Sequence, residues 1–173
     1  MRALGLVGLL VGCGGGDGSS GCPSFATITG GTFTRSGTDL VWTLSVEQIS
    51  ELTFNKAGSS VLEYRWSVEL DSDRNNSTDL RVAVSYFARN GEAEMTTTDI
   101  LGKTQEDVWA VASNGGASSV GSATATLANN TFTLMTNDRE EAALANVTDV
   151  SQSTWMASYF WSLDDNCTDT FKP

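Results

Sequence analysis

Two segments of alternating apolar and polar residues, 61–70 and 80–88, constrain the fold of this chain more than any other feature. Successive side chains of a β-strand point to opposite sides of a sheet, so a period of two predicts strands with one buried face. An acidic, asparagine-rich loop, 71–79, joins the two segments. The side chains expected to point into the core are Leu62, Tyr64, Trp66, Val68, Leu70, Leu80, Val82, Val84 and Tyr86.

Further short segments along the 173 residues have the same character. Strands are predicted at 25–29, 32–35, 40–46, 92–98, 107–112, 122–128, 131–136 and 155–163. Turns are predicted at 36–39, 55–60, 90–91 and 129–130, a glycine-serine loop at 113–121, and one short helix at 138–145. Short strands with turn-rich connections indicate an all-β fold, an antiparallel β-sandwich of jelly-roll or immunoglobulin-like type.

Four tryptophans occupy positions that the alternation places inside the sandwich. Large aromatic side chains at such positions fill the space between two sheets, so we interpret them as core residues rather than as ligand contacts. They are Trp42, Trp66, Trp155 and Trp161.

Residues 1–12 have the features of a lipoprotein signal peptide. Arg2 precedes an apolar run, 4–11, which is too short to span a membrane. Residues 10–13 (LVGC) resemble a bacterial lipobox, the signal that directs lipid to a cysteine. A chance cysteine after an ordinary secretory signal is the alternative.

The lipobox resemblance implies lipid on Cys13 and a location in the bacterial cell envelope. A Gly/Ser-rich tether over 13–22 would then connect the lipid to the β-sandwich domain over 23–173. Gly14 stands where an aspartate would favour retention in the inner membrane, so we expect the outer membrane, on its periplasmic or surface face.

Cys22 and Cys167 stand near the two ends of the expected domain. Exported proteins reside where disulfides persist, so we predict a bridge between them. In the chain-entropy model, closing so long a loop stabilises the fold by at most about 4–5 kcal/mol. Two unpaired thiols are the alternative.

The composition excludes several classes of function. The chain has no histidine, which removes serine–histidine–acid triads, histidine zinc sites and histidine-ligated haem. A net charge of −11 disfavours a nucleic-acid partner, and no glycine-rich nucleotide loop follows a strand. Paired carboxylates of a glycoside hydrolase remain the enzymatic alternative, but we expect no catalytic residues.

The stretch 66–78 reads as an aromatic strand followed by D-x-D-x-N-x-x-T. It resembles secreted bacterial β-sandwiches of the DOMON-like group, which includes carbohydrate-binding modules of xylan-degrading enzymes. The hairpin at 123–136, the short helix and the last aromatic strand follow the layout of that group. Asp79 departs from its common glycine, and the chain has no histidine, whereas haem-binding members use methionine and histidine ligands. The resemblance therefore implies sugar binding or a structural role.

Phe87, Met156 and Phe160 stand at outward strand positions where polar residues are expected. Exposed aromatic rings can stack on sugar rings, so Phe87 and Phe160 are candidate ligand-binding residues. Isolated surface apolar residues are common, which is the alternative. We expect a non-catalytic binding module for carbohydrate, with a structural or adhesion lipoprotein without a small ligand as the second interpretation.

The loop 71–79 carries a candidate calcium site, because calcium takes roughly six to eight oxygen ligands. Its spacing begins like an EF-hand, but Val82 replaces the bidentate glutamate and Asn76 replaces the glycine. Asparagine adopts the left-handed conformation readily, so we expect a weak site with Kd on the order of 10⁻⁴ M or looser. A solvated turn is the alternative. The candidate ligands are Asp71, Asp73, Asn75 and Asp79.

Overall fold

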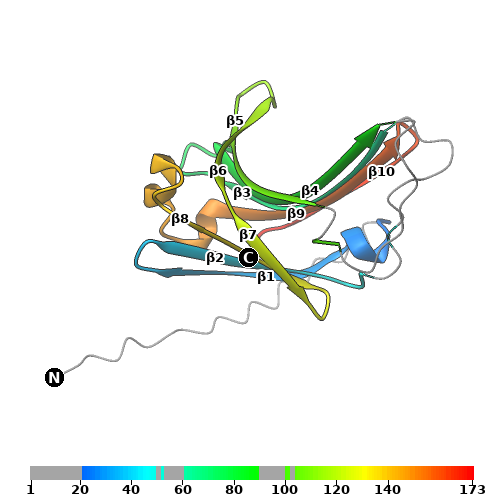
Figure 1. Ribbon diagram of the computed structural model, residues 1–173, viewed down its shortest axis with the longest axis horizontal. Coiled ribbons are helices and arrows are strands. Elements are labelled where there is room, and N and C mark those ends of the chain that lie inside the picture. The colour runs from blue at the N-terminus through cyan, green and yellow to red at the C-terminus, as the bar shows by residue number, and fades with distance from the viewer. Residues whose placement is uncertain (1–20, 50–51, 53–60, 90–99, 102–103) are drawn as a thin grey trace.

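The computed structural model describes residues 21–49, 52, 61–89, 100–101 and 104–173. These residues form two antiparallel sheets packed face to face, which confirms the predicted all-β sandwich (Figure 1). The four-stranded sheet has the order β1 (Ile28–Ser36), β2 (Asp39–Val46), β8 (Thr131–Asn137), β7 (Thr124–Ala128). The six-stranded sheet has the order β10 (Asp165–Phe171), β9 (Ser153–Ser162), β3 (Val61–Leu70), β4 (Leu80–Arg89), β5 (Gln105–Val111), β6 (Ala117–Ser122).

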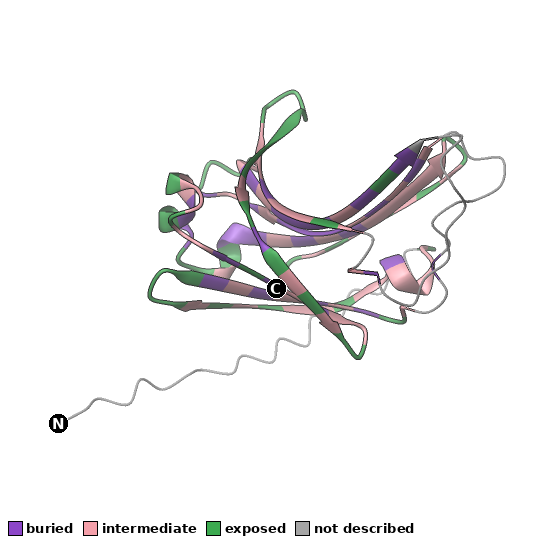
Figure 2. Cartoon of the chain, in the orientation of Figure 1, coloured by how far each residue is buried: buried purple, intermediate pink, exposed green. Residues whose placement is uncertain are grey.

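The strands β3 and β4 orient their side chains as the alternation predicts. All nine residues expected to point inward are buried, and β3 lies at the centre of its sheet between β4 and β9. Buried residues follow the strands, whereas the hairpin tips are exposed (Figure 2). No charged side chain is buried among the residues that the structure describes. The space between the sheets is therefore an apolar core.

The inner tryptophans fill this core as predicted, and each places its indole N–H against an acceptor. Trp42, Trp66 and Trp155 are fully buried, whereas Trp161 is half-buried. Trp42 donates to the Ser153 hydroxyl at 3.1 Å, and Trp66 donates to the Phe25 carbonyl at 2.8 Å. Trp155 donates to the Thr43 carbonyl at 2.7 Å, and Trp161 donates to the Tyr64 hydroxyl at 3.1 Å.

The predicted disulfide is confirmed, because Cys22 and Cys167 are bonded with their Cα atoms 5.6 Å apart. Cys167 lies on the edge strand β10, where the sequence predicts no strand. The Ile28 N–H also donates to the Asp169 carboxylate at 2.8 Å. The segment 22–28 and the last strand are thus joined by a covalent bond and a hydrogen bond.

The prediction of two separate strands at 25–29 and 32–35 is wrong, because β1 begins at Ile28 and continues through Gly30 and Gly31. A Cβ atom at Gly31 would lie 2.6 Å from the indole of Trp155. Only glycine leaves room for this ring, so the residue serves core packing rather than a turn.

The predicted glycine-serine loop at 113–121 is also wrong in its second half, where β6 begins at Ala117. This strand is an edge strand that pairs with β5, and most of its side chains are exposed. Its register shifts where Val108 pairs with Gly121 and Trp109 pairs with Ser119. An exposed, bulged edge strand carries no alternation of apolar residues, so its sequence does not indicate a strand.

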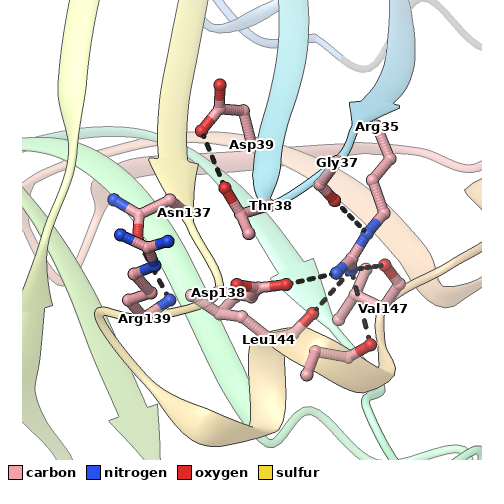
Figure 3. A network of polar contacts seen from close by, with 10 residues as sticks. Arg35, Gly37, Thr38, Asp39, Asn137, Asp138, Arg139, Leu144 and Val147 are labelled. Atoms are coloured by element: carbon pink, nitrogen blue, oxygen red, sulfur yellow. Dashed lines mark hydrogen bonds and ion pairs between the residues drawn. The ribbon is translucent and has the colours of Figure 1, made fainter.

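The predicted helix at 138–145 is shorter than expected: the described residues contain only the 3-10 helices η1 (Ser24–Ala26), η2 (Ala142–Asn146) and η3 (Val150–Gln152), of which η2 covers the second half of the predicted range. Arg35 of β1 gives the reason (Figure 3). Its guanidinium donates to the carbonyls of Leu144 at 3.0 Å and Val147 at 2.7 Å. It also pairs with the Asp138 carboxylate at 2.5 Å. These tertiary bonds fix the segment as tight turns.

Other predictions lie outside the described residues. They are the signal peptide at 1–12, Cys13 with most of the tether, the turn at 55–60, the turn at 90–91 and the strand at 92–98. Among the described residues, no helix has the length and apolar character that crossing a membrane requires.

Candidate functional site

The outer face of the six-stranded sheet carries a groove of about 790 Å³. The sheet curves so that this face is concave, and the ends of β5 and β6 bend away from the four-stranded sheet (Figure 1). Gly115 and Ala117, at the turn between β5 and β6, contribute to its wall. The side chains that give the groove its chemistry are Glu63, Arg65, Arg81, Phe87, Gln105 and Trp109.

The arginines of the groove are held by carboxylates on the same face. Arg81 contacts both carboxylate oxygens of Glu69, from Nε at 2.5 Å and from a terminal nitrogen at 3.1 Å. Arg65 pairs with Glu63, two residues away on β3. A guanidinium bound through two N–H groups is fixed in orientation, so its remaining N–H groups are aimed before any ligand arrives. The groove therefore presents ordered donors and acceptors.

Aromatic side chains stand at two places along this groove. Phe87 on β4 is 55% exposed, the largest exposed fraction of an aromatic residue in the described part of the chain. Trp109 on β5 is half-buried and lies directly opposite Arg81 in the β4–β5 register. Paired residues of antiparallel strands share a face, so Trp109 faces outward with Arg81.

Phe160 and Met156, the other predicted outward residues, lie on β9 at the neighbouring side of this face. Glu63 of β3 pairs with Phe87 on one side and with Phe160 on the other. Phe160 and Met156 are half-buried, and neither is among the residues that line the groove. The structure therefore places Phe87 in the groove and Phe160 beyond Glu63, two strands away.

The loop between β3 and β4 brings three of the four candidate calcium ligands together. Carboxylate oxygens of Asp71, Asp73 and Asp79 lie within 4.8 Å of one another. Asn76 has φ of 67°, so it does adopt the left-handed conformation expected for the place of glycine. The fourth candidate, Asn75, accepts a hydrogen bond from the Ser77 N–H at 2.7 Å through its amide oxygen.

Backbone amides already bind the three carboxylates of this loop. Asp71 accepts from the N–H groups of Asn75 at 2.9 Å and Asn76 at 2.8 Å. Asp79 accepts from the N–H and the hydroxyl of Ser72, at 2.8 and 2.9 Å. These bonds organise the turn by themselves. The arrangement is compatible with both a weak cation site and a self-contained acidic turn.

Sequence reasoning missed the groove residues Trp109, Arg65 and Arg81. A signal for Trp109 was present, because Val108 points inward and the next residue of a strand must point outward. The charged outward positions of 61–70 were also visible. The sequence does not show that these charged positions lie next to Trp109, because that depends on the pairing of β5 with β4.

The chain matches no protein-family model, no curated protein and no solved structure. The resemblance to DOMON-like sandwiches therefore depends on the stretch 66–78 and on the layout of the strands alone.

Proposed function

We propose that this protein is a lipid-anchored lipoprotein of the bacterial cell envelope whose β-sandwich is a non-catalytic module that binds carbohydrate. The observation that supports this most is the concave groove with Phe87 at its surface and ordered ion pairs along its floor. A surface aromatic of this exposure next to fixed polar groups is typical of a ligand site.

The chemistry of the groove suits a sugar. A pyranose ring has C–H groups that pack on an aromatic face and hydroxyls that both donate and accept hydrogen bonds. Arg65 and Arg81 supply donors, Glu63 supplies acceptors, and Gln105 supplies both. Because the charged groups are paired, hydroxyls can bind them without leaving an unpaired charge in the site.

The test is a glycan array that covers plant, microbial and host glycans. We expect wild-type protein to bind at least one class, and Phe87→Ala combined with Phe160→Ala to abolish that signal. The two single variants separate the groove from the β9 side of the face. Met135→Ala is the matched control, because Met135 is 39% exposed on the outer face of the four-stranded sheet. Absence of binding on the whole array would favour the structural or adhesion role.

The anchor is tested separately from the ligand. Intact mass of membrane-extracted protein should show a lipid adduct on the mature chain beginning at Cys13. Cys13→Ser protein should leave the membrane fraction. If the variant still fractionates with membranes, the anchor assignment is wrong.

We also propose that the 71–79 loop binds calcium weakly, because three carboxylates converge there. Binding to the folded state alone raises the melting temperature. We expect wild type to melt higher in millimolar calcium than in chelator, and Asp71→Ala combined with Asp73→Ala to lose that difference. Equal melting temperatures for wild type in both conditions would leave the loop as a turn.

A further inference from the structure

Trp109 differs from the other four tryptophans of the chain in its surroundings. Each inner tryptophan donates its indole N–H to an acceptor and contacts another aromatic ring. Within the part of the chain that the structure describes, Trp109 makes neither kind of contact. A buried tryptophan usually satisfies its N–H, so a tryptophan that lines a groove without doing so is positioned for an external partner.

Trp109 and Phe87 lie at different places along the length of the groove. Trp109 pairs with Arg81, and Phe87 follows Arg81 by six residues on the same strand. Six residues of extended strand span about 20 Å. Both aromatics line the one groove, so it has an aromatic platform near each end, with Arg81 beside Trp109 and Arg65, which pairs with Ser85, between the two ends. Such a span exceeds one sugar ring and fits several rings in a row.

The charges of the face favour an uncharged occupant. Arg65 is paired with Glu63 and Arg81 with Glu69, so these four side chains sum to zero. The whole chain carries a net charge of −11, which repels polyanions at long range. An acidic polysaccharide would meet carboxylates beside every arginine of the groove, whereas a neutral chain of hydroxyls would not.

On the basis of the proposed carbohydrate function, we propose that Trp109 is a second stacking platform and that the groove binds an internal stretch of a linear, neutral polysaccharide. The chain lies along β4 and β5, with one ring on Phe87 and another on Trp109. The guanidinium group of Arg65 donates to hydroxyls of the rings between the two platforms, and that of Arg81 donates to hydroxyls of the ring on Trp109.

Calorimetric titration with a length series tests this assignment. The probes are cello-, xylo-, manno- and chito-oligosaccharides from disaccharide to hexasaccharide, with oligogalacturonates as the acidic series. We expect affinity for one neutral series to rise with length by about tenfold or more until both platforms are covered. Trp109→Ala should remove that gain while changing disaccharide affinity less than twofold. Trp109→Phe should keep most of it, and Met135→Ala should keep all of it.

The outcomes separate the two proposals. Neutral oligosaccharides that bind with the same affinity at every length, or with full affinity to a folded Trp109→Ala variant, overturn the assignment of Trp109 and leave the carbohydrate function standing. Tighter binding of oligogalacturonates overturns the neutral occupant. No binding of any series overturns this inference together with the proposed function. Near-ultraviolet circular dichroism and the melting temperature establish that each variant is folded.

Discussion

The two faces of the six-stranded sheet use the same residue types for different purposes. On the inner face, Trp66 and Trp155 are fully buried, bind backbone carbonyls and pack on other rings. On the outer face, Trp109 lines a groove beside Arg81. The side of the sheet to which a tryptophan points therefore decides whether it packs in the core or lines the groove on the outer face.

Polar groups differ between the faces in the same way. The polar groups of the inner face are single hydroxyls and indole N–H groups that hydrogen-bond within the core. For example, the Trp161 indole N–H donates to the Tyr64 hydroxyl at 3.1 Å. The outer face carries full charges, and the arginines of the groove are paired with carboxylates, Arg65 within β3 and Arg81 across β3 and β4. Inner polar groups thus complete the core, whereas outer polar groups keep unused donors and acceptors that face solvent.

The largest difference is expected for alanine substitutions of tryptophans on opposite faces. Trp66→Ala should lower the free energy of unfolding by about 3–5 kcal/mol, because it opens a cavity in the core. Trp109→Ala should lower it by about 1 kcal/mol or less, as for a surface substitution. Urea unfolding of both variants measures this. Equal losses would show that Trp109 is a core residue.

An intermediate effect is expected from Tyr64, whose burial raises its pKa from 10.0 to about 12. The folded state favours the neutral phenol, so this contribution is complete below pH 10 and is lost as pH rises from 10 to about 12. A shift of this size corresponds to about 2–3 kcal/mol. Tyr64→Phe should therefore show a flatter loss of stability over this range.

Urea unfolding at several alkaline pH values gives that slope. The lysines titrate in both proteins, so their effect cancels in the comparison. An identical slope for wild type and Tyr64→Phe would mean that the Tyr64 hydroxyl is not held neutral by the core.

A small stability effect, comparable to that of Trp109→Ala, is expected on the outer face from Glu69→Gln. The two side chains of the Glu69–Arg81 pair are 11% and 15% exposed, so the loss should be about 1 kcal/mol and should shrink at high salt. The same variant should weaken glycan binding, because Arg81 loses its fixed orientation. Unfolding at low and high salt, with glycan titration, measures both. A variant with unchanged binding would separate Arg81 from the site.

The sequence predicts the inner face well and the outer face poorly, for physical reasons. Burial demands a strict alternation, so 61–70 and 80–88 reveal both their strands and their inward residues. The left-handed Asn76 and the Cys22–Cys167 bridge were also accessible, because each depends on one residue type or one pair.

The groove depends on features that no local pattern encodes. It requires the pairing of β4 with β5, the curvature of the sheet and the edge strand β6, whose exposed residues carry no periodicity. The helix predicted at 138–145 is reduced to the short 3-10 helix η2 for a similar reason, because Arg35, more than a hundred residues earlier, holds the carbonyls of that segment. Tertiary contacts overrode a local preference there.

The most direct test of the proposed carbohydrate site is an NMR titration of the five indole N–H groups of the tryptophans. Trp109→Phe removes one resonance and so assigns it. When the ¹⁵N-labelled protein is titrated with the neutral hexasaccharides, we predict that the Trp109 resonance moves to saturation while those of Trp42, Trp66 and Trp155 stay in place. A Trp109 resonance that does not move with any of these sugars, or shifts confined to the inner tryptophans, would contradict a binding site on the concave outer face.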